Sequence, residues 1–154
     1  MKKLSILLAL LLLLTLTLIG CGGEGGESKE GIYVELTQDK SEAAVGEKIK
    51  VTVMLSCDKE VKSYGLELKY DKDLFELVDN RILDSGAIAD FSDDILVVAY
   101  DNPTTIYKNV FTFTLKAKAT CSNEEISVYA SLKDKNDSTI AIDNYYDSSV
   151  TIYE

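Results

Sequence analysis

GLELKYDKDLFELVD, residues Gly65–Asp79, predicts two short strands joined by a charged turn. Apolar and charged side chains alternate from Leu66 to Tyr70, which places the apolar ones on one face of a strand. Three charged residues, 71–73, interrupt this alternation before a second apolar run, 74–78, begins. The turn residues and the period of two together favour antiparallel β-structure over a helix.

The chain after residue 31 repeats this pattern of short alternating runs. Turns rich in Gly, Asp and Asn separate the runs, and no run has the apolar stripe of an amphipathic helix. We expect the only proline, Pro103, in a loop, where its missing N–H costs no ladder hydrogen bond. The pattern predicts a β-sandwich or barrel and not βαβ units. The predicted strands are 32–36, 49–55, 61–70, 95–100, 111–119, 126–130 and 150–153.

The first twenty residues differ in composition from everything that follows. Residues 1–20 have the pattern of a secretory signal peptide: two lysines, an apolar run (4–19) and a small residue before the cysteine. The apolar run is shorter than the roughly 20 residues of a membrane-spanning helix. Residues 18–21 also resemble a bacterial lipobox, so we expect cleavage to leave Cys21 as a lipid-bearing N-terminus. An ordinary signal peptide and a retained signal anchor are the alternatives.

Residues 21–31 are rich in glycine and glutamate and contain no apolar side chain to bury, which is typical of a flexible tether. Residues 32–154 are long enough for one domain with its own core. After removal of 1–20, 14 basic and 26 acidic side chains give a net charge of −12, which disfavours nucleic acid and anionic lipid as partners. We expect an exported protein that is lipid-anchored to the bacterial cell membrane, with its domain facing outward.

The two remaining cysteines predict a disulfide. Cys57 continues the inward-facing positions of strand 49–55, and Cys121 continues those of strand 111–119. Each lies at the end of its run, and exported proteins mature where disulfides persist. We therefore expect a Cys57–Cys121 bridge whose long loop would contribute about 4 kcal/mol to stability. Two buried free thiols are the alternative.

Several of these runs resemble segments of cohesin domains. The resemblance spans nearly all of residues 32–153 and implies a nine-stranded jelly-roll β-sandwich. It makes the corner at Tyr70 and Asp71 structural, with the tyrosine packed inward and the carboxylate accepting backbone N–H groups of the turn. The matching segments are 45–53 for the turn into the second strand, 61–71 and 74–78 for the third and fourth, 95–102 for the sixth, 110–115 for the eighth and 150–152 for the last.

Cohesins bind dockerins, which are small calcium-loaded helical modules of polysaccharide-degrading enzymes. The resemblance implies a binding surface on the third, fifth, sixth and eighth strands. Strand register then predicts an exposed apolar stripe on the sixth strand, with Ile95, Val97 and Ala99 in the core. The predicted partner-binding residues are Ser63, Gly65, Glu67 and Lys69 on the third strand and Leu96, Val98 and Tyr100 on the sixth.

The composition excludes several kinds of enzyme. The chain has no histidine, so it can build neither a Ser-His-Asp triad nor a His-ligated zinc site. No glycine-rich phosphate loop follows a predicted strand, and 26 carboxylates make chance acidic pairs inevitable. We expect no catalysis and no cofactor. Asp93-Asp94 and residues 134–137 are the candidates for a surface calcium ion, although neither has the ligand spacing of an EF-hand.

The resulting hypothesis is a non-catalytic surface lipoprotein that docks a dockerin-type module of a polysaccharide-degrading system. A carbohydrate-binding lipoprotein is the first alternative, because sugar sites on β-sandwiches present aromatic rings. The chain has no tryptophan, so its available platforms are Tyr100, Tyr107, Tyr145 and Tyr146. A scaffold subunit of an envelope complex is the second alternative.

Overall fold

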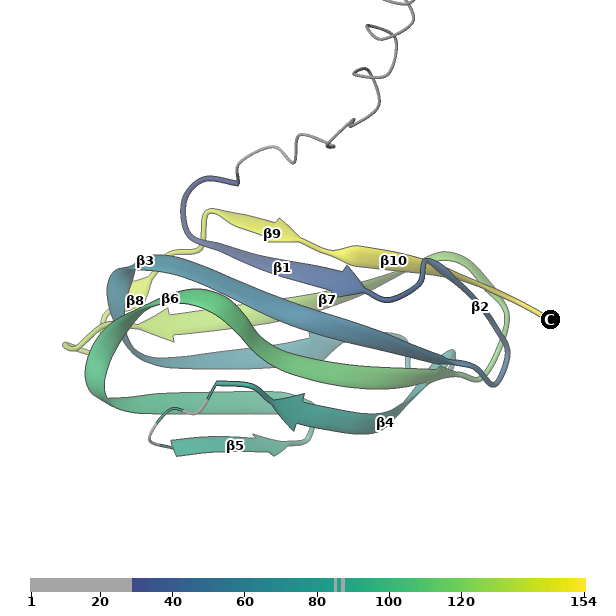
Figure 1. The fold of residues 1–154 in the computed structure, drawn as a ribbon, viewed down its shortest axis with the longest axis horizontal. Coiled ribbons are helices and arrows are strands. Elements are labelled where there is room, and N and C mark those ends of the chain that lie inside the picture. The colour runs from purple at the N-terminus through teal and green to yellow at the C-terminus, as the bar shows by residue number, and fades with distance from the viewer. Residues whose placement is uncertain (1–28, 85, 87) are drawn as a thin grey trace, which may run out of the picture.

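The computed structural model describes residues 29–84, 86 and 88–154, and this part of the chain forms β-strands and no helix (Figure 1). The predicted all-β jelly-roll sandwich is confirmed. No helix that could span a membrane occurs among these residues. The strands are β1 (Tyr33–Gln38), β2 (Glu42–Ala44), β3 (Lys48–Lys69), β4 (Phe75–Ile82), β5 (Ile88–Ser92), β6 (Ile95–Ala117), β7 (Cys121–Lys133), β8 (Thr139–Ile140), β9 (Asn144–Tyr146) and β10 (Ser148–Tyr153).

Two long strands, β3 and β6, take part in both layers of the sandwich. Their halves 48–57 and 106–117 pair with each other and with β1 and β4, and β9 extends this layer beyond β1. We call this layer the β1 sheet. Their other halves, 61–69 and 95–104, pair with each other, with β5 and with β7. We call this layer the β7 sheet, and β10, β2 and β8 attach to it through β7.

The bends in β3 and β6 explain why sequence runs predicted as separate strands are continuous. The pairing register shifts between Cys57 and Ser63, and this irregularity lets both strands turn from one sheet into the other. Figure 1 shows both long ribbons bending at the left-hand end of the molecule. Pro103 lies within β6 at this bend and not in a loop. Residues 100–103 have no partner on β3, so the missing N–H of the proline still removes no bond to that strand.

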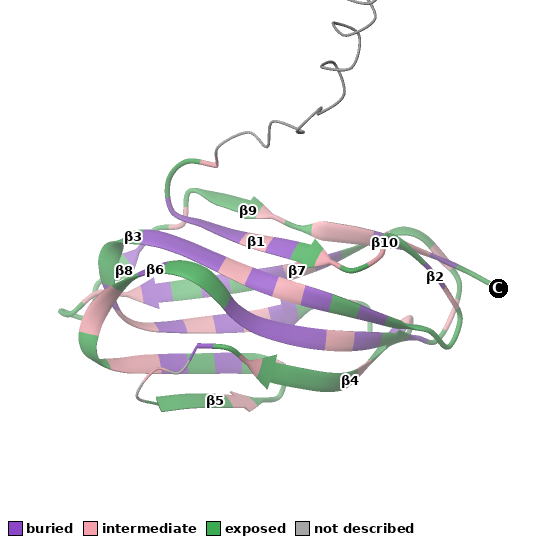
Figure 2. Cartoon of the chain, viewed as in Figure 1, coloured by how far each residue is buried: buried purple, intermediate pink, exposed green. Residues whose placement is uncertain are grey.

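The core lies between the two sheets and follows the period of two. Val51, Val53 and Leu55 of the β1 sheet are fully buried, as are Leu66 and Val98 of the β7 sheet. Figure 2 shows buried and less buried residues alternating along these strands. All buried apolar side chains of the described residues lie between positions 32 and 152. Residues 29–154 therefore hold a complete core and are expected to fold as a unit.

The corner at residues 70–73 has the structural role that we predicted. The Tyr70 ring packs against the core, and its hydroxyl donates a hydrogen bond to Asp94 Oδ1 over 3.1 Å. Burial and the neighbouring Asp94 carboxylate raise the pKa of Tyr70 to about 12. Asp71 Oδ1 accepts the backbone N–H of Asp73 at 2.7 Å, which closes an Asx turn. The corner thus joins β3 to β4.

The predicted disulfide between Cys57 and Cys121 is wrong, because both thiols are free and lie near opposite ends of the sandwich. Cys57 is paired with Ile106 at the bend, whereas Cys121 begins β7 just after the end of β6, which pairs with the start of β3. The stretch of β3 from Lys48 to Cys57 extends about 30 Å, far beyond the Cα separation of about 7 Å that a disulfide tolerates. Cys57 does keep the inward phase of its strand, but Cys121 belongs to β7 and not to the strand that was expected to continue through it.

The N-terminal predictions concern residues mostly outside the described part of the chain. The signal peptide 1–20 and the lipid-bearing Cys21 both lie there. The last residues of the tether are held to the domain: Lys29 Nζ lies 2.5 Å from Glu35 Oε1 and 4.4 Å from the centre of the Tyr146 ring. The backbone N–H of Ile32 donates to Asp143 Oδ2 at 2.8 Å. These contacts fix where the chain enters β1.

Candidate functional site

The outward positions of the β7 sheet line up in rows across four strands. In the central row, Val97 of β6 lies opposite Asp90 of β5 and Gly65 of β3, and Gly65 lies opposite Ser131 of β7. The rows on either side contain larger apolar side chains on β5, β6 and β7. We call this surface the β7-sheet face, and its rows are Ile88, Ala99, Ser63 and Lys133; Asp90, Val97, Gly65 and Ser131; and Ser92, Ile95, Glu67 and Tyr129.

The orientation predicted for the third strand is confirmed by burial along the second half of β3. Its inward residues, Tyr64, Leu66 and Leu68, are buried, whereas the positions between them are half-buried or exposed. The outward residues are Ser63, Gly65, Glu67 and Lys69, as predicted. Gly65 has no side chain, and a Cβ there would meet Ser131 Oγ at 3.2 Å, so the serine hydroxyl lies close to the glycine at the centre of the face.

The orientation predicted for the sixth strand is wrong. Leu96 and Val98 are fully buried, whereas Val97 is 50% exposed and Ile95 is also exposed. Tyr100 has the same phase as Val98 and turns its hydroxyl toward the interior, where it meets Asp84. The β7-sheet face therefore contains an apolar patch, but other residues of β6 form it.

The error has a simple physical origin. Residues 95–100 are apolar at both phases, so polarity alone does not tell which face is buried. Cross-strand pairing decides it: Leu96 lies opposite Leu66 and Val98 opposite Tyr64, and directly opposed residues share a face. The two-residue turn Asp93-Asp94, with φ of 50° and 63°, fixes the β5–β6 register, and this turn is visible in the sequence.

Two further strands of the face were missed or misplaced by the sequence reading. Residues 110–115, predicted as the eighth strand, pair with β4 and the first half of β3 in the β1 sheet. β7 completes the face instead, with Tyr129 and Ser131 exposed on it. β5 adds Ile88, which is exposed, at the opposite edge. The alternation Ser127-Val128-Tyr129-Ala130 is the signal that could have placed β7 here.

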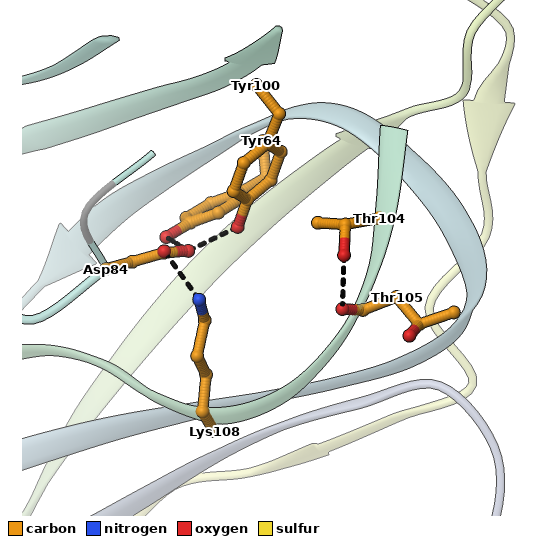
Figure 3. A network of polar contacts seen from close by, with 6 residues as sticks. All are labelled: Tyr64, Asp84, Tyr100, Thr104, Thr105 and Lys108. Carbon is orange, nitrogen blue, oxygen red and sulfur yellow. Dashed lines mark hydrogen bonds and ion pairs between the residues drawn. The ribbon is translucent and has the colours of Figure 1, made fainter. Parts of the chain in front are cut away.

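A buried carboxylate connects the segment before β5 to both layers. Asp84 is 2% exposed, and three side chains converge on it (Figure 3). Lys108 Nζ lies 2.6 Å from Asp84 Oδ1, and the hydroxyls of Tyr64 and Tyr100 donate to Oδ2, the first over 2.9 Å. These partners come from the second half of β3 and from two separate parts of β6. In the sequence, Asp84 stands in one of the Asp- and Gly-containing turns that separate the predicted strands, and nothing there marks it as buried.

The electrostatics of this network keep Asp84 ionised. Burial alone would raise the pKa of Asp84, but hydrogen bonds from Lys108, Tyr100 and Tyr64 outweigh burial and hold the pKa below its usual value. Burial and the adjacent carboxylate raise the pKa of both tyrosines, so they remain hydroxyl donors. A buried anion satisfied by three donors has a structural role here: it fixes the chain that leads into β5.

The backbone around Asp84 supports the same conclusion. The N–H groups of Leu83 and Asp84 donate to the Val110 carbonyl at 2.9 and 3.1 Å. A Cβ on Gly86 would lie 2.7 Å from Val98 Cγ1 and 3.0 Å from the Ala99 carbonyl oxygen, so a side chain there would displace β6 or the connection. This close approach places β5 at the edge of the β7-sheet face.

The family of the chain follows from a comparison with known sequence families. The family model that matches it is the cohesin domain, over residues 34–152, which is most of the chain and the whole sandwich. The chain belongs to the cohesin family. The predicted family is therefore confirmed, and cohesin domains are non-catalytic binding modules. A comparison with curated proteins gives no match.

Solved cohesin structures share this fold at low sequence identity. A cohesin module from a family 33 glycoside hydrolase of Clostridium perfringens superposes with a TM-score of 0.61 and 18% identity, covering 80% of this chain and 99% of that one. The sixth cohesin of scaffoldin B from Acetivibrio cellulolyticus, in complex with a Cel5 dockerin, gives 0.60 and 16%, covering 80% and 100%. A non-cellulosomal cohesin from the archaeon Archaeoglobus fulgidus gives 0.59 and 14%, covering 79% and 92%.

The acidic turns of this cohesin domain have structural partners. Asp94 lies 2.6 Å from Lys72 Nζ and accepts the Tyr70 hydroxyl. Asp134 Oδ1 accepts the backbone N–H groups of Asn136 and Ser138. In the part of the chain that the structure describes, no three Cys, Asp or Glu side chains gather as a metal site would require.

The expected tyrosine platforms of the cohesin domain are scattered. Tyr100 is turned toward Asp84, and Tyr146 packs edge-on against Tyr33, with Lys29 Nζ over its ring. Tyr107 is exposed on the β1 sheet. Tyr145 is exposed beside Tyr129, which the sequence reading did not single out. Tyr107 and Tyr146 therefore both neighbour Tyr33 on the β1 sheet, whereas Tyr100 and Tyr145 lie apart from them.

Proposed function

We propose that this cohesin domain docks a protein module of the dockerin type through the β7-sheet face. The observation that carries the proposal is the exposure of Ile88, Ile95 and Val97 around Gly65 on a face made by four paired strands. These side chains lie outside the core, so they do not serve the stability of the sandwich. An exposed apolar patch with polar surroundings is typical of a protein-binding surface.

The shape and charge of the face favour a partner with an apolar ridge. Gly65 places no side chain between Val97 and Ser131, so a side chain of the partner can approach the β3 backbone there, beside Ser131 Oγ. The face carries Asp90 and Glu67 together with Lys69 and Lys133, and Lys69 Nζ pairs with Glu67, so its charges balance and the apolar contacts are expected to dominate binding. The partner-binding residues are then Ser63, Gly65, Glu67, Lys69, Ile88, Ile95 and Val97, with Leu96, Val98 and Tyr100 in supporting positions behind the face.

Two solved cohesins that resemble this chain support the type of partner. The Acetivibrio cellulolyticus cohesin is in complex with a Cel5 dockerin. A Clostridium thermocellum cohesin, at TM-score 0.55 and 15% identity, is part of a type I cohesin–dockerin complex. Carried over to this chain, the proposal is non-catalytic attachment of a dockerin-bearing component of a polysaccharide-degrading system.

We further propose that the domain acts at the outer surface of a bacterial cell membrane. Three features of the sequence support this location: the signal-like residues 1–20, the lipobox cysteine Cys21 and the tether 21–31. The test is metabolic labelling of the full chain with a fatty-acid analogue. Label on the wild type that is lost in Cys21→Ala supports the anchor, whereas equal label on both proteins contradicts it.

Binding of the domain 29–154 to a panel of immobilised dockerins, with and without calcium, tests the docking function. We expect calcium-dependent capture that Val97→Asp weakens about 30-fold, since it buries a charge in the interface. Val78→Asp is the matched control, because Val78 is also exposed, on β4 of the other sheet. Failure of every dockerin to bind, or equal loss in both variants, contradicts the proposal.

A further inference from the structure

A second candidate site lies at the edge of the β7 sheet. A hollow of about 310 Å³ opens there between the end of β3, the strand β7 and the segment joining β9 to β10. Its walls combine two aromatic rings with charged and hydroxyl groups. The lining residues are Lys69, Ser127, Val128, Tyr129, Tyr145 and Asp147.

The two rings are nearly parallel although they come from different strands. The planes of Tyr129 and Tyr145 differ by 9°, and their centres are 6.5 Å apart. Tyr129 is 62% exposed and Tyr145 is 39% exposed, so both present apolar surface to solvent. Neither ring is needed to fill the core.

The Tyr145 ring is held in place before any ligand arrives. Its hydroxyl donates to the Ala130 carbonyl at 3.2 Å and accepts the Ala130 N–H at 3.4 Å. This pair of bonds ties β9 to β7 across the hollow. A ring fixed in this way loses little conformational entropy on binding, which favours affinity.

Polar groups surround the rings on the same hollow. Asp147 offers carboxylate oxygens, Lys69 offers an ammonium group and Ser127 offers a hydroxyl. A ligand that matches this lining needs apolar C–H faces to lie on the tyrosines and hydroxyl groups that both donate and accept. The two opposite charges disfavour a ligand with strong charge of either sign.

We propose that this hollow is a binding site for a neutral glycan chain. A sugar ring has both required features, the C–H face and the ring of hydroxyls, in one unit. With a single aromatic pair at a sheet edge, the site fits a few residues of one soluble chain. The hollow shares Tyr129 and Lys69 with the β7-sheet face, whereas Tyr145 and Asp147 lie outside its rows, so Tyr145 is the position that tests glycan binding apart from protein docking.

Affinity electrophoresis of the domain 29–154 in gels containing xylan, mixed-linkage β-glucan, xyloglucan or glucomannan tests the proposal. We expect at least one of these polymers to retard the wild type and Tyr129→Ala to weaken binding about tenfold. Tyr145→Phe, which keeps the ring, should bind more tightly than Tyr145→Ala. Tyr107→Ala, at an exposed tyrosine of the other sheet, is the matched control and should behave as the wild type.

The outcomes separate this site from protein docking. Val97→Asp should leave glycan retardation unchanged, and Tyr145→Ala should leave dockerin capture unchanged. Thermal unfolding of each variant checks that it is folded. Absence of retardation by all four polymers overturns the glycan site, as does equal loss of binding in Tyr129→Ala and Tyr107→Ala.

Discussion

The outer faces of the two sheets differ, although the same two strands build the middle of both. On the β1 sheet, the outward positions of β3 and β6 include Lys50, Thr52, Thr114 and Lys116. On the β7 sheet, β6 instead exposes Ile95 and Val97, and β3 places Gly65 between them and β7.

This difference teaches which apolar residues serve folding and which are available for binding. Both sheets bury apolar side chains on their inner faces, so the core explains the apolar residues there. It does not explain Val97, which is half exposed and points away from the core. Polar residues at the corresponding positions of the β1 sheet indicate that this fold tolerates them on an outer face.

The largest expected effect concerns Asp84, which ties the β7-sheet edge to the core. Asp84→Ala should lower the free energy of unfolding by about 3 kcal/mol, because the buried hydroxyl of Tyr64 and the half-buried hydroxyl of Tyr100 lose their acceptor. Lys108 is half exposed and can be solvated, so it adds little to this loss. Lys72→Ala is the control, since it breaks only an exposed ion pair with Asp94 and should cost much less stability. Urea denaturation measures both, and equal losses would contradict the assigned role of Asp84.

The next largest effect is the loss of partner affinity when a glutamine is placed on the outer face of each sheet in turn. Gly65→Gln should weaken partner binding about tenfold, because its side chain projects from the centre of the β7-sheet face where the partner would lie. Thr52→Gln, at an outward position of the β1 sheet, should change affinity less than about twofold. Isothermal titration calorimetry with a captured dockerin measures the difference. The reverse ranking would move the docking surface to the β1 sheet.

Stability toward acid should also depend on Asp84. The folded-state pKa of Asp84 lies below its usual value, so its contribution is fully present above about pH 3.9 and is lost as pH falls through the folded pKa. Asp84→Asn should therefore be less stable near neutrality but lose less stability than the wild type on acidification. Urea denaturation at pH 6, 4 and 3 tests the sign. Parallel curves for the two proteins would show that Asp84 is not the titrating group.

The smallest expected effect concerns the two cysteines, which lie at opposite ends of the sandwich. Because Cys57 and Cys121 are free and far apart, a reducing agent should leave the Tm of the domain 29–154 unchanged. A disulfide closing this loop would be worth about 4 kcal/mol and would shift Tm by many degrees. Thiol titration in denaturant should find both cysteines reactive. A drop in Tm on reduction would reinstate the predicted bridge.

The fold could be predicted from the sequence because the alternating strand patterns and the turn residues agree along the chain. The corner at Tyr70 and Asp71 and the phase of the third strand could both be predicted from residue order. The phase of residues 95–100 was not readable, because an apolar run has no polar side to mark solvent. The Asp84 network also escaped prediction, since its partners lie 20, 16 and 24 residues away and meet only in the folded protein.

Hydroxyl-radical footprinting of the domain 29–154, free and saturated with a captured dockerin, tests the central claim most directly. It measures how far solvent reaches each side chain, and Val97, Ile95, Val78 and Tyr107 are exposed in the free domain. The account predicts that the partner protects Ile95 and Val97 while labelling of Val78 and Tyr107 stays unchanged. Protection of Val78 and Tyr107, with Ile95 and Val97 still labelled, would contradict it.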